Sequence, residues 1–260
     1  MRIVSNLLVL SCLLVSCAGK RIAREDIEDG LPPWMTEGEE VRLAIAWDLI
    51  DSYNTLGALE IVRQMRSEGF SSPELDLLQG KALLLDGVTS EAERLLLAAQ
   101  KRMPRDSRPP SELCVLYADE GRIEQALAQC QRAADLDDSN AKAWNNLSFL
   151  LLAAERARDA IKAAEQAVLL DGADPRYRNN LGLAQAALGR TEVAFRTLGS
   201  TMPQADAAYM VGLAVERFES YPQALPWYER ALESNPNHPG AQQKLEPPDD
   251  GAQDAPVEEP

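Results

Sequence analysis

The sequence predicts an all-α fold, a solenoid built from repeated helix-turn-helix units. The first observation is an alanine that recurs every 34 residues and once more after 30, at Ala58, Ala92, Ala126, Ala160, Ala194 and Ala224. The second is a column of small residues twelve positions before each alanine. The third is a glycine between the two columns, at Gly87, Gly121 and Gly189. A left-handed glycine typically ends a helix, so each unit should contain two helices joined by a turn.

The period divides residues 39–238 into six blocks: 39–72, 73–106, 107–140, 141–174, 175–204 and 205–238. Position 8 of the blocks holds Ala46, Gly80, Cys114, Ser148, Gly182 and Gly212. Together with the alanine at position 20, these small side chains should let two antiparallel helices approach closely. Ser72-Pro73 and Asp174-Pro175 place a capping side chain before a first-turn proline, which predicts a helix start at each site.

This pattern resembles the tetratricopeptide repeat. The match is strongest in block 141–174, where the characteristic positions hold Trp144, Leu147, Ala160 and Ala167. The resemblance covers residues 39–238 and implies a right-handed α-solenoid of five to six repeats. The first block departs from the pattern at Arg42, Met65 and Phe70. This departure favours a capping role for the first block, which would leave five true repeats.

The first residues of the chain are typical of a targeting segment. Arg2 precedes an apolar stretch over residues 3–15 that is too short to span a membrane. The run Leu14-Val15-Ser16-Cys17 resembles the bacterial lipobox, which implies cleavage of residues 1–16 as a signal peptide and acylation of Cys17. The alternative is a simple secretory signal with an incidental cysteine. Ala18 after the cysteine resembles outer-membrane sorting, so we expect a lipid-anchored protein of the bacterial envelope that faces the periplasm.

Polar segments flank the repeats. Residues 17–38 are interpreted as a lipidated tether. Residues 239–260 are interpreted as an acidic, proline-rich, disordered tail, whose first residues, 240–245, could add one more helical turn. With 26 Lys plus Arg against 41 Asp plus Glu, the net charge is −15. Because phosphate binding requires clustered positive charge, this balance argues against nucleic acid as a partner.

The sequence carries no recognisable catalytic signature. It has no nucleophile elbow, zinc-protease motif or phosphate-binding loop. Its one histidine, His238, is interpreted as an exposed loop residue at the end of the last block. We therefore expect a protein that is not an enzyme and has no cofactor, metal or small-molecule substrate, with a hydrolase as the weakest alternative.

Cys114 and Cys130 occupy positions 8 and 24 of one block. In an exported protein the pair could form a disulfide, and closing this loop would stabilise the fold by about 3 kcal/mol. Antiparallel pairing, however, sets position 8 opposite position 20 and leaves position 24 one turn away. The Cα atoms could then exceed the roughly 7 Å that a disulfide allows. We expect two buried, reduced cysteines, with the disulfide as the alternative.

In tetratricopeptide proteins the first helices line a concave groove, so the resemblance also implies where a partner would bind. The inward positions of blocks four to six give a candidate site of Lys142, Asn145, Phe149, Arg176, Asn179, Leu183, Tyr209 and Leu213. Its amides could pair with a peptide backbone, and its apolar side chains could form pockets. The alternative is that several of these residues pack between repeats. Asn146 and Asn180, at position 6, are interpreted as structural.

The expected function is an interaction scaffold that binds a peptide segment or a subunit of an envelope complex. A closer resemblance is to the repeat lipoproteins of pilus and secretion assembly, the pilotins and the tight-adherence pilus lipoprotein. It rests on the lipobox, the repeats, the run Asn179-Asn180-Leu181-Gly182-Leu183 and the segment around Met202-Pro203. The alternative is an adaptor for peptidoglycan-remodelling enzymes.

Overall fold

The computed structural model describes residues 37–245 of the 260-residue chain, and within them the only regular elements are thirteen helices. The helices are α1 (Glu37–Asp51), α2 (Thr55–Ser67), α3 (Pro73–Leu85), α4 (Thr89–Arg102), α5 (Arg108–Asp119), α6 (Ile123–Leu136), α7 (Ala141–Ala153), α8 (Ala157–Leu170), α9 (Pro175–Ala187), α10 (Thr191–Gly199), α11 (Gln204–Phe218), α12 (Tyr221–Ser234) and α13 (Pro239–Leu245). The predicted signal peptide, Cys17, nearly all of the predicted tether and residues 246–260 lie outside the described residues.

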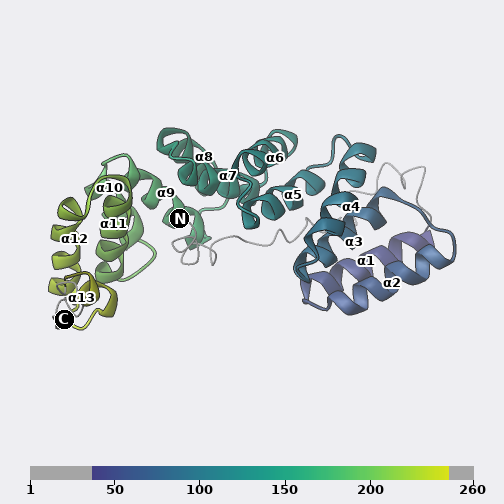
Figure 1. The fold of residues 1–260 in the computed structure, drawn as a ribbon, viewed down its shortest axis with the longest axis horizontal. Helices are drawn as coiled ribbons and strands as arrows, with labels where there is room; N and C mark the ends of the chain where they lie inside the picture. The colour runs from purple at the N-terminus through teal and green to yellow at the C-terminus, as the bar shows by residue number, and fades with distance from the viewer. Residues whose placement is uncertain (1–36, 246–260) are drawn as a thin grey trace, which may run out of the picture.

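The helices form six consecutive pairs, and α13 follows the last pair. Each second helix also contacts the first helix of the next pair, and successive first helices contact one another. Figure 1 shows the result, an arch whose central part has α5, α7 and α9 on the inner side and α6 and α8 on the outer side. The predicted fold class, an all-α solenoid of helix-turn-helix repeats, is confirmed for the described residues.

The helix boundaries follow from local chemistry. Ser72 accepts a hydrogen bond from the backbone N–H of Leu75 at the start of α3, and Asp174 accepts one from Arg176 at the start of α9. Both caps precede a first-turn proline, as predicted. Gly87, Gly121 and Gly189 have φ values of +76°, +70° and +74° after α3, α5 and α9. The left-handed conformation that the glycine column predicts is therefore present at all three turns.

Where position 8 is glycine, it packs closely against position 24 of the same repeat. A Cβ atom added to Gly182 would lie 2.6 Å from Cγ of Leu198, sixteen residues later, and 3.4 Å from the carbonyl oxygen of Ala194. A Cβ atom added to Gly80 would meet the side chain of Leu96, and one added to Gly212 would meet Tyr228, in both cases again sixteen residues later in the sequence. In these three repeats the glycine at position 8 thus makes room for a large side chain at position 24, and this pairing sets how closely the two helices approach.

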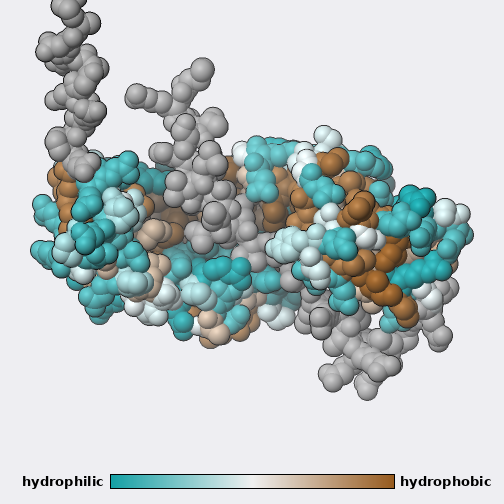
Figure 2. Space-filling model, turned by 90° about the horizontal axis from the view of Figure 1, so that it is seen from below, coloured by the Kyte–Doolittle hydropathy of each residue, from teal (hydrophilic) through white to brown (hydrophobic). Residues whose placement is uncertain are grey.

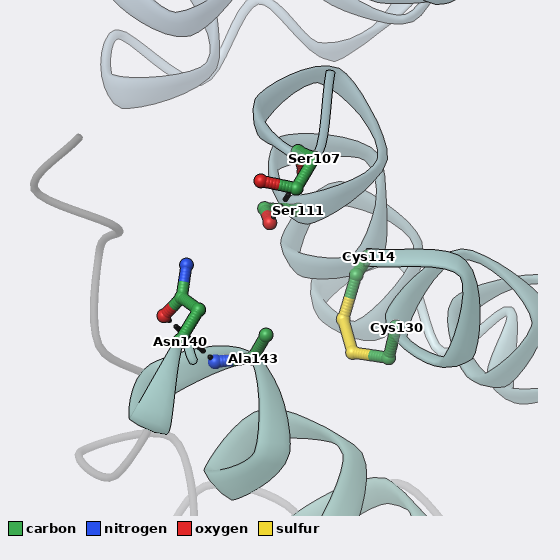
Figure 3. Close-up of a disulfide and its surroundings, with 6 residues drawn as sticks. All are labelled: Ser107, Ser111, Cys114, Cys130, Asn140 and Ala143. Carbon is green, nitrogen blue, oxygen red and sulfur yellow. Dashed lines mark hydrogen bonds between the residues drawn. A yellow bond between two sulfur atoms is a disulfide. The ribbon is translucent and has the colours of Figure 1, made fainter. Parts of the chain in front are cut away.

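The expectation of reduced cysteines is wrong in this structure. Cys114 on α5 and Cys130 on α6 form a disulfide with their Cα atoms 5.1 Å apart (Figure 3). The reason is the pairing of positions 8 and 24, because both cysteines occupy it. Helix side chains tilt toward the N-terminus of their helix, and the two helices are antiparallel. The side chains at positions 8 and 24 therefore tilt toward each other. Both cysteines are buried.

After the last repeat, where the sequence suggested one more helical turn before the tail, Pro239–Leu245 form the seven-residue helix α13, whose Ala241 is fully buried. One expectation about this end of the repeats is also wrong. His238 is buried rather than exposed, because its Nδ1 accepts a hydrogen bond from the backbone N–H of Ala241 and its Nε2 lies 3.1 Å from Oδ1 of Asp206. The histidine therefore joins α13 to α11.

Within residues 37–245, every helix is too short or too polar to span a lipid bilayer.

Candidate functional site

The first helices of the repeats supply the inner side of the arch, and its C-terminal half comes from α7, α9 and α11. Direct contacts between α7 and α9 and between α9 and α11 place their side chains in one continuous surface. The eight candidate residues come from these three helices. The structure separates them into a buried group and a half-buried group.

Asn145, Phe149 and Leu183 are buried. Nδ2 of Asn180 donates a hydrogen bond of 2.7 Å to Oδ1 of Asn145, which joins α9 to α7. Phe149 and Leu183 lie in the same apolar cluster as the helix-packing residues. For these three residues the structure favours the alternative reading, packing between repeats.

Lys142, Arg176, Asn179, Tyr209 and Leu213 are half-buried. Arg176 forms an ion pair with Asp174, the cap of its own helix. Oδ1 of Asn179 accepts a hydrogen bond of 2.5 Å from the hydroxyl of Thr201. The ring of Tyr209 lies 4.8 Å from the ring of His238, measured between centroids, and its hydroxyl end packs against Gly240. The part of the candidate site that keeps exposed surface therefore centres on these five residues.

Position 6 carries an unexpected feature. Oδ1 of Asn146 on α7 and Oδ1 of Asn180 on α9 are buried and have no hydrogen-bond donor among the described residues. An unsatisfied buried carbonyl costs about 1–3 kcal/mol. Two such acceptors on neighbouring first helices suit N–H donors supplied by a bound chain. Both asparagines were interpreted as structural, so sequence reasoning did not include them in the site.

The N-terminal half of the first-helix surface carries a charged network that sequence reasoning missed. Arg108 on α5 donates two hydrogen bonds, of 2.6 and 2.8 Å, to the carboxylate of Glu74 on α3. Nε1 of Trp47 on α1 donates a third hydrogen bond to Glu74, at 3.0 Å. Lys81 Nζ lies 5.3 Å from the centroid of the Trp47 ring and 3.2 Å from the carboxylate of Glu112.

This network consists of paired charges in a low-dielectric environment. Burial raises the pKa of Glu112, and the ammonium group of Lys81 opposes the rise. Because the bidentate Arg108–Glu74 pair crosses from one repeat to the next, it stabilises the register of the stack. The sequence did contain a signal. Trp47 and Lys81 share position 9 of their blocks and Glu74 and Arg108 share position 2, inward positions that were considered only for blocks four to six.

No group of three or more histidine, cysteine, aspartate or glutamate side chains in residues 37–245 could hold a metal ion.

An arch of paired helices with a continuous first-helix surface defines the chain as a helical-repeat protein of the α-solenoid class. Residues 150–205 and 195–239 match the model of the tetratricopeptide repeat. The fold is thus a solenoid of tetratricopeptide repeats. No curated protein sequence matches the chain.

Solved structures of tetratricopeptide proteins share this fold. YrrB, described as a tetratricopeptide protein with an unusual peptide-binding site, is 18% identical with a TM-score of 0.58, and the match covers 70% of this chain and 96% of YrrB. The pilF protein of Pseudomonas aeruginosa is 14% identical with a TM-score of 0.60, and the match covers 78% of this chain and 95% of the pilF chain. MamA of Desulfovibrio magneticus RS-1 is 18% identical with a TM-score of 0.55, covering 66% and 98%. At these identities the likeness is one of fold.

Proposed function

We propose that the protein is a protein–protein interaction scaffold that captures a segment of a partner along α7, α9 and α11. The observation that carries this proposal is the pair of buried, unpartnered carbonyl oxygens of Asn146 and Asn180. A peptide offers N–H groups at regular intervals, and a helical-repeat stack can present acceptors to them without large ordering costs of its own. YrrB supports the proposal as a protein of the same fold with a peptide-binding site.

A charge reversal tests this surface. Lys142→Glu changes a half-buried cation of α7 that forms no salt bridge within residues 37–245, although its charge acts on Glu112 and Asp174. If a partner lies along this surface, its recovery after in-cell crosslinking should fall about tenfold, because a like charge or a lost contact costs about 1.4 kcal/mol. Mass spectrometry of the crosslinked partners measures the recovery.

Lys162→Glu is the matched control, since Lys162 is a highly exposed lysine on α8, a second helix of the outer side. Both variants should melt at the temperature of the unmodified chain. Equal recovery for the two variants would exclude the α7–α11 surface as the docking site. A lowered melting temperature for Lys142→Glu alone would assign Lys142 to the packing between repeats.

The more specific proposal is a lipid-anchored envelope scaffold in assembly of a pilus or secretion complex. Its support is the lipobox ending at Cys17, which lies outside the described residues, and the fold shared with pilF. An adaptor for peptidoglycan enzymes is the alternative function. The identity of the crosslinked partner distinguishes the two, since one predicts pilus or secretion subunits and the other predicts cell-wall enzymes.

Cys17→Ala tests the anchor. Acyl chains contribute about 0.8 kcal/mol for each buried methylene, so a lipidated protein should stay in the membrane fraction. The variant should move to the soluble fraction or remain as an uncleaved precursor. Unchanged membrane fractionation with the signal peptide removed would contradict the anchor, and mass spectrometry of the N-terminus shows which form is present.

A further inference from the structure

The turns of the first two repeats present three apolar side chains to solvent, which we call the apolar edge. Tyr53 lies between α1 and α2, Leu56 in the first turn of α2, and Val88 just before α4, and they are 75%, 80% and 45% exposed. Oγ1 of Thr55 donates a hydrogen bond of 2.7 Å to Oδ1 of Asp86, so the two turns lie side by side. Figure 2 shows apolar surface gathered at the end of the molecule that α1 to α4 form.

The later repeats carry charged or polar side chains at the same positions. Position 16, which holds Val88, is arginine in the next three repeats, at Arg122, Arg156 and Arg190. Position 18, which holds Leu56, is polar or charged in the next four repeats, at Ser90, Glu124, Arg158 and Glu192. The repeat fold therefore does not require apolar side chains along these turns.

Tyr53 also has a backbone conformation that favours glycine. Its φ is +58°, and the equivalent residues of three later repeats are the left-handed glycines Gly87, Gly121 and Gly189. Among the described residues, Glu155 is the other non-glycine residue with a positive φ. A bulky side chain in this region costs free energy, and a ring with three quarters of its surface exposed gains little packing to offset it. Such an outlier favours a role outside the packing of the repeats.

We propose that the apolar edge inserts into the surface of a zwitterionic lipid bilayer, a contact that rests on the lipid anchor proposed above. Side chains that project this far from a turn can enter the headgroup region, whereas ligand sites on proteins are mostly concave. Tyrosine is enriched at membrane interfaces because its ring is apolar and its hydroxyl stays hydrated. Asp51 and Asp86 are exposed two residues before Tyr53 and Val88, so an anionic leaflet would repel the edge.

The place of the edge in the chain agrees with this contact. Cys17, the proposed acylation site, precedes Glu37, the first described residue, by 20 residues. A chain of that length spans at most about 66–72 Å, so an anchor at Cys17 keeps the first two repeats nearest to the bilayer. Three side chains are too few to hold a protein on a membrane, and stable attachment usually combines two signals. The edge therefore acts as a second contact that orients the solenoid on the surface.

Depth-dependent fluorescence quenching tests the proposal. A histidine tag in place of residues 1–17 tethers the chain to phosphatidylcholine vesicles through a nickel-chelating lipid and leaves the described repeats intact. Leu56→Cys carries an environment-sensitive fluorophore, and Cys114 and Cys130 do not react because they are paired. A quencher on the lipid acyl chains should reduce its emission about fivefold more than that of the same label on Leu169→Cys. Leu169 is the matched control because it is 77% exposed on α8.

Tyr53→Gly separates a membrane contact from a structural role. In the chain labelled at position 56, it should lower the inserted fraction by up to about tenfold, because burial of one aromatic side chain changes a partition constant by roughly that factor. Its melting temperature should equal or exceed that of the unmodified chain, since glycine adopts a positive φ without strain. A lowered melting temperature would instead assign Tyr53 to the packing of the repeats and contradict the proposal.

Two further results would overturn the contact. Equal quenching at positions 56 and 169 would show that the edge does not enter the bilayer. Because the chelating lipid replaces the acyl chains, this failure is distinct from failure of the anchor, which Cys17→Ala tests separately. A fluorescence change at position 56 that occurs without vesicles and weakens on dilution would assign the apolar edge to a second copy of the chain.

Discussion

Removing the Cys114–Cys130 disulfide is expected to lower the free energy of unfolding by about 3 kcal/mol. The bond joins residues 16 apart, and closing a loop of this size limits the conformations of the unfolded chain by about that amount. For a domain of roughly 200 residues, this loss corresponds to about 6–12 °C in the melting temperature. Thermal unfolding followed by circular dichroism, with and without reductant, measures the effect.

The double variant Cys114→Ala with Cys130→Ala is the control for the reductant. Its melting temperature should lie near that of the reduced chain and should not change when reductant is added. If the unmodified chain melts at one temperature with and without reductant, the two cysteines are not paired in solution. Labelling of both thiols in the denatured, unreduced protein would give the same answer independently.

The second large effect is expected at Gly182 and Leu198. Leu198→Ala should cost about 2–5 kcal/mol, because a fully buried leucine leaves a cavity. Gly182→Ala should cost about 1–3 kcal/mol, because the new Cβ would lie 2.6 Å from Cγ of Leu198. The double variant should lose less stability than the sum of the two, since each change offsets the other in volume.

Gly199→Ala is the matched control on α10, where an added Cβ meets nothing within 4 Å. This variant should be at least as stable as the unmodified chain, because alanine favours a helix over glycine by up to about 1 kcal/mol. Denaturant unfolding of the unmodified chain, the two single variants and the double variant gives the coupling free energy between positions 182 and 198. Additive losses would mean that this pair does not set the spacing of the helices.

The repeat columns predicted the fold because they report local packing. The columns are the alanines from Ala58 to Ala224, the small residues at position 8 and the glycines after the first helices. Each residue of a column packs or turns within its own helix pair, so its place in the block determines its place in the structure. The disulfide was missed although its two positions were read correctly, since the tilt of side chains along a helix decides which facing position they reach. The spacing alone does not give that tilt.

The candidate site was harder to predict because it depends on how repeats stack. The bond between Asn145 and Asn180 joins residues of different blocks, and block position alone did not indicate which inward residues would be buried. The burial of His238 depends on α13, whose short sequence resembles the tail that follows it. The Trp47, Glu74 and Arg108 network follows the same inward positions and could have been found by extending them to the first three blocks.

The disulfide also limits how far the chain can be stretched. Neighbouring repeats in a solenoid hold one another, so a pull on both ends would extract helix pairs one after another. Within the third pair the disulfide prevents the 16-residue stretch between Cys114 and Cys130 from being pulled out. At about 3.3–3.6 Å for each extended residue, this is roughly 55 Å of contour length that tension cannot release. Under load the middle of the arch would therefore extend less than its two ends.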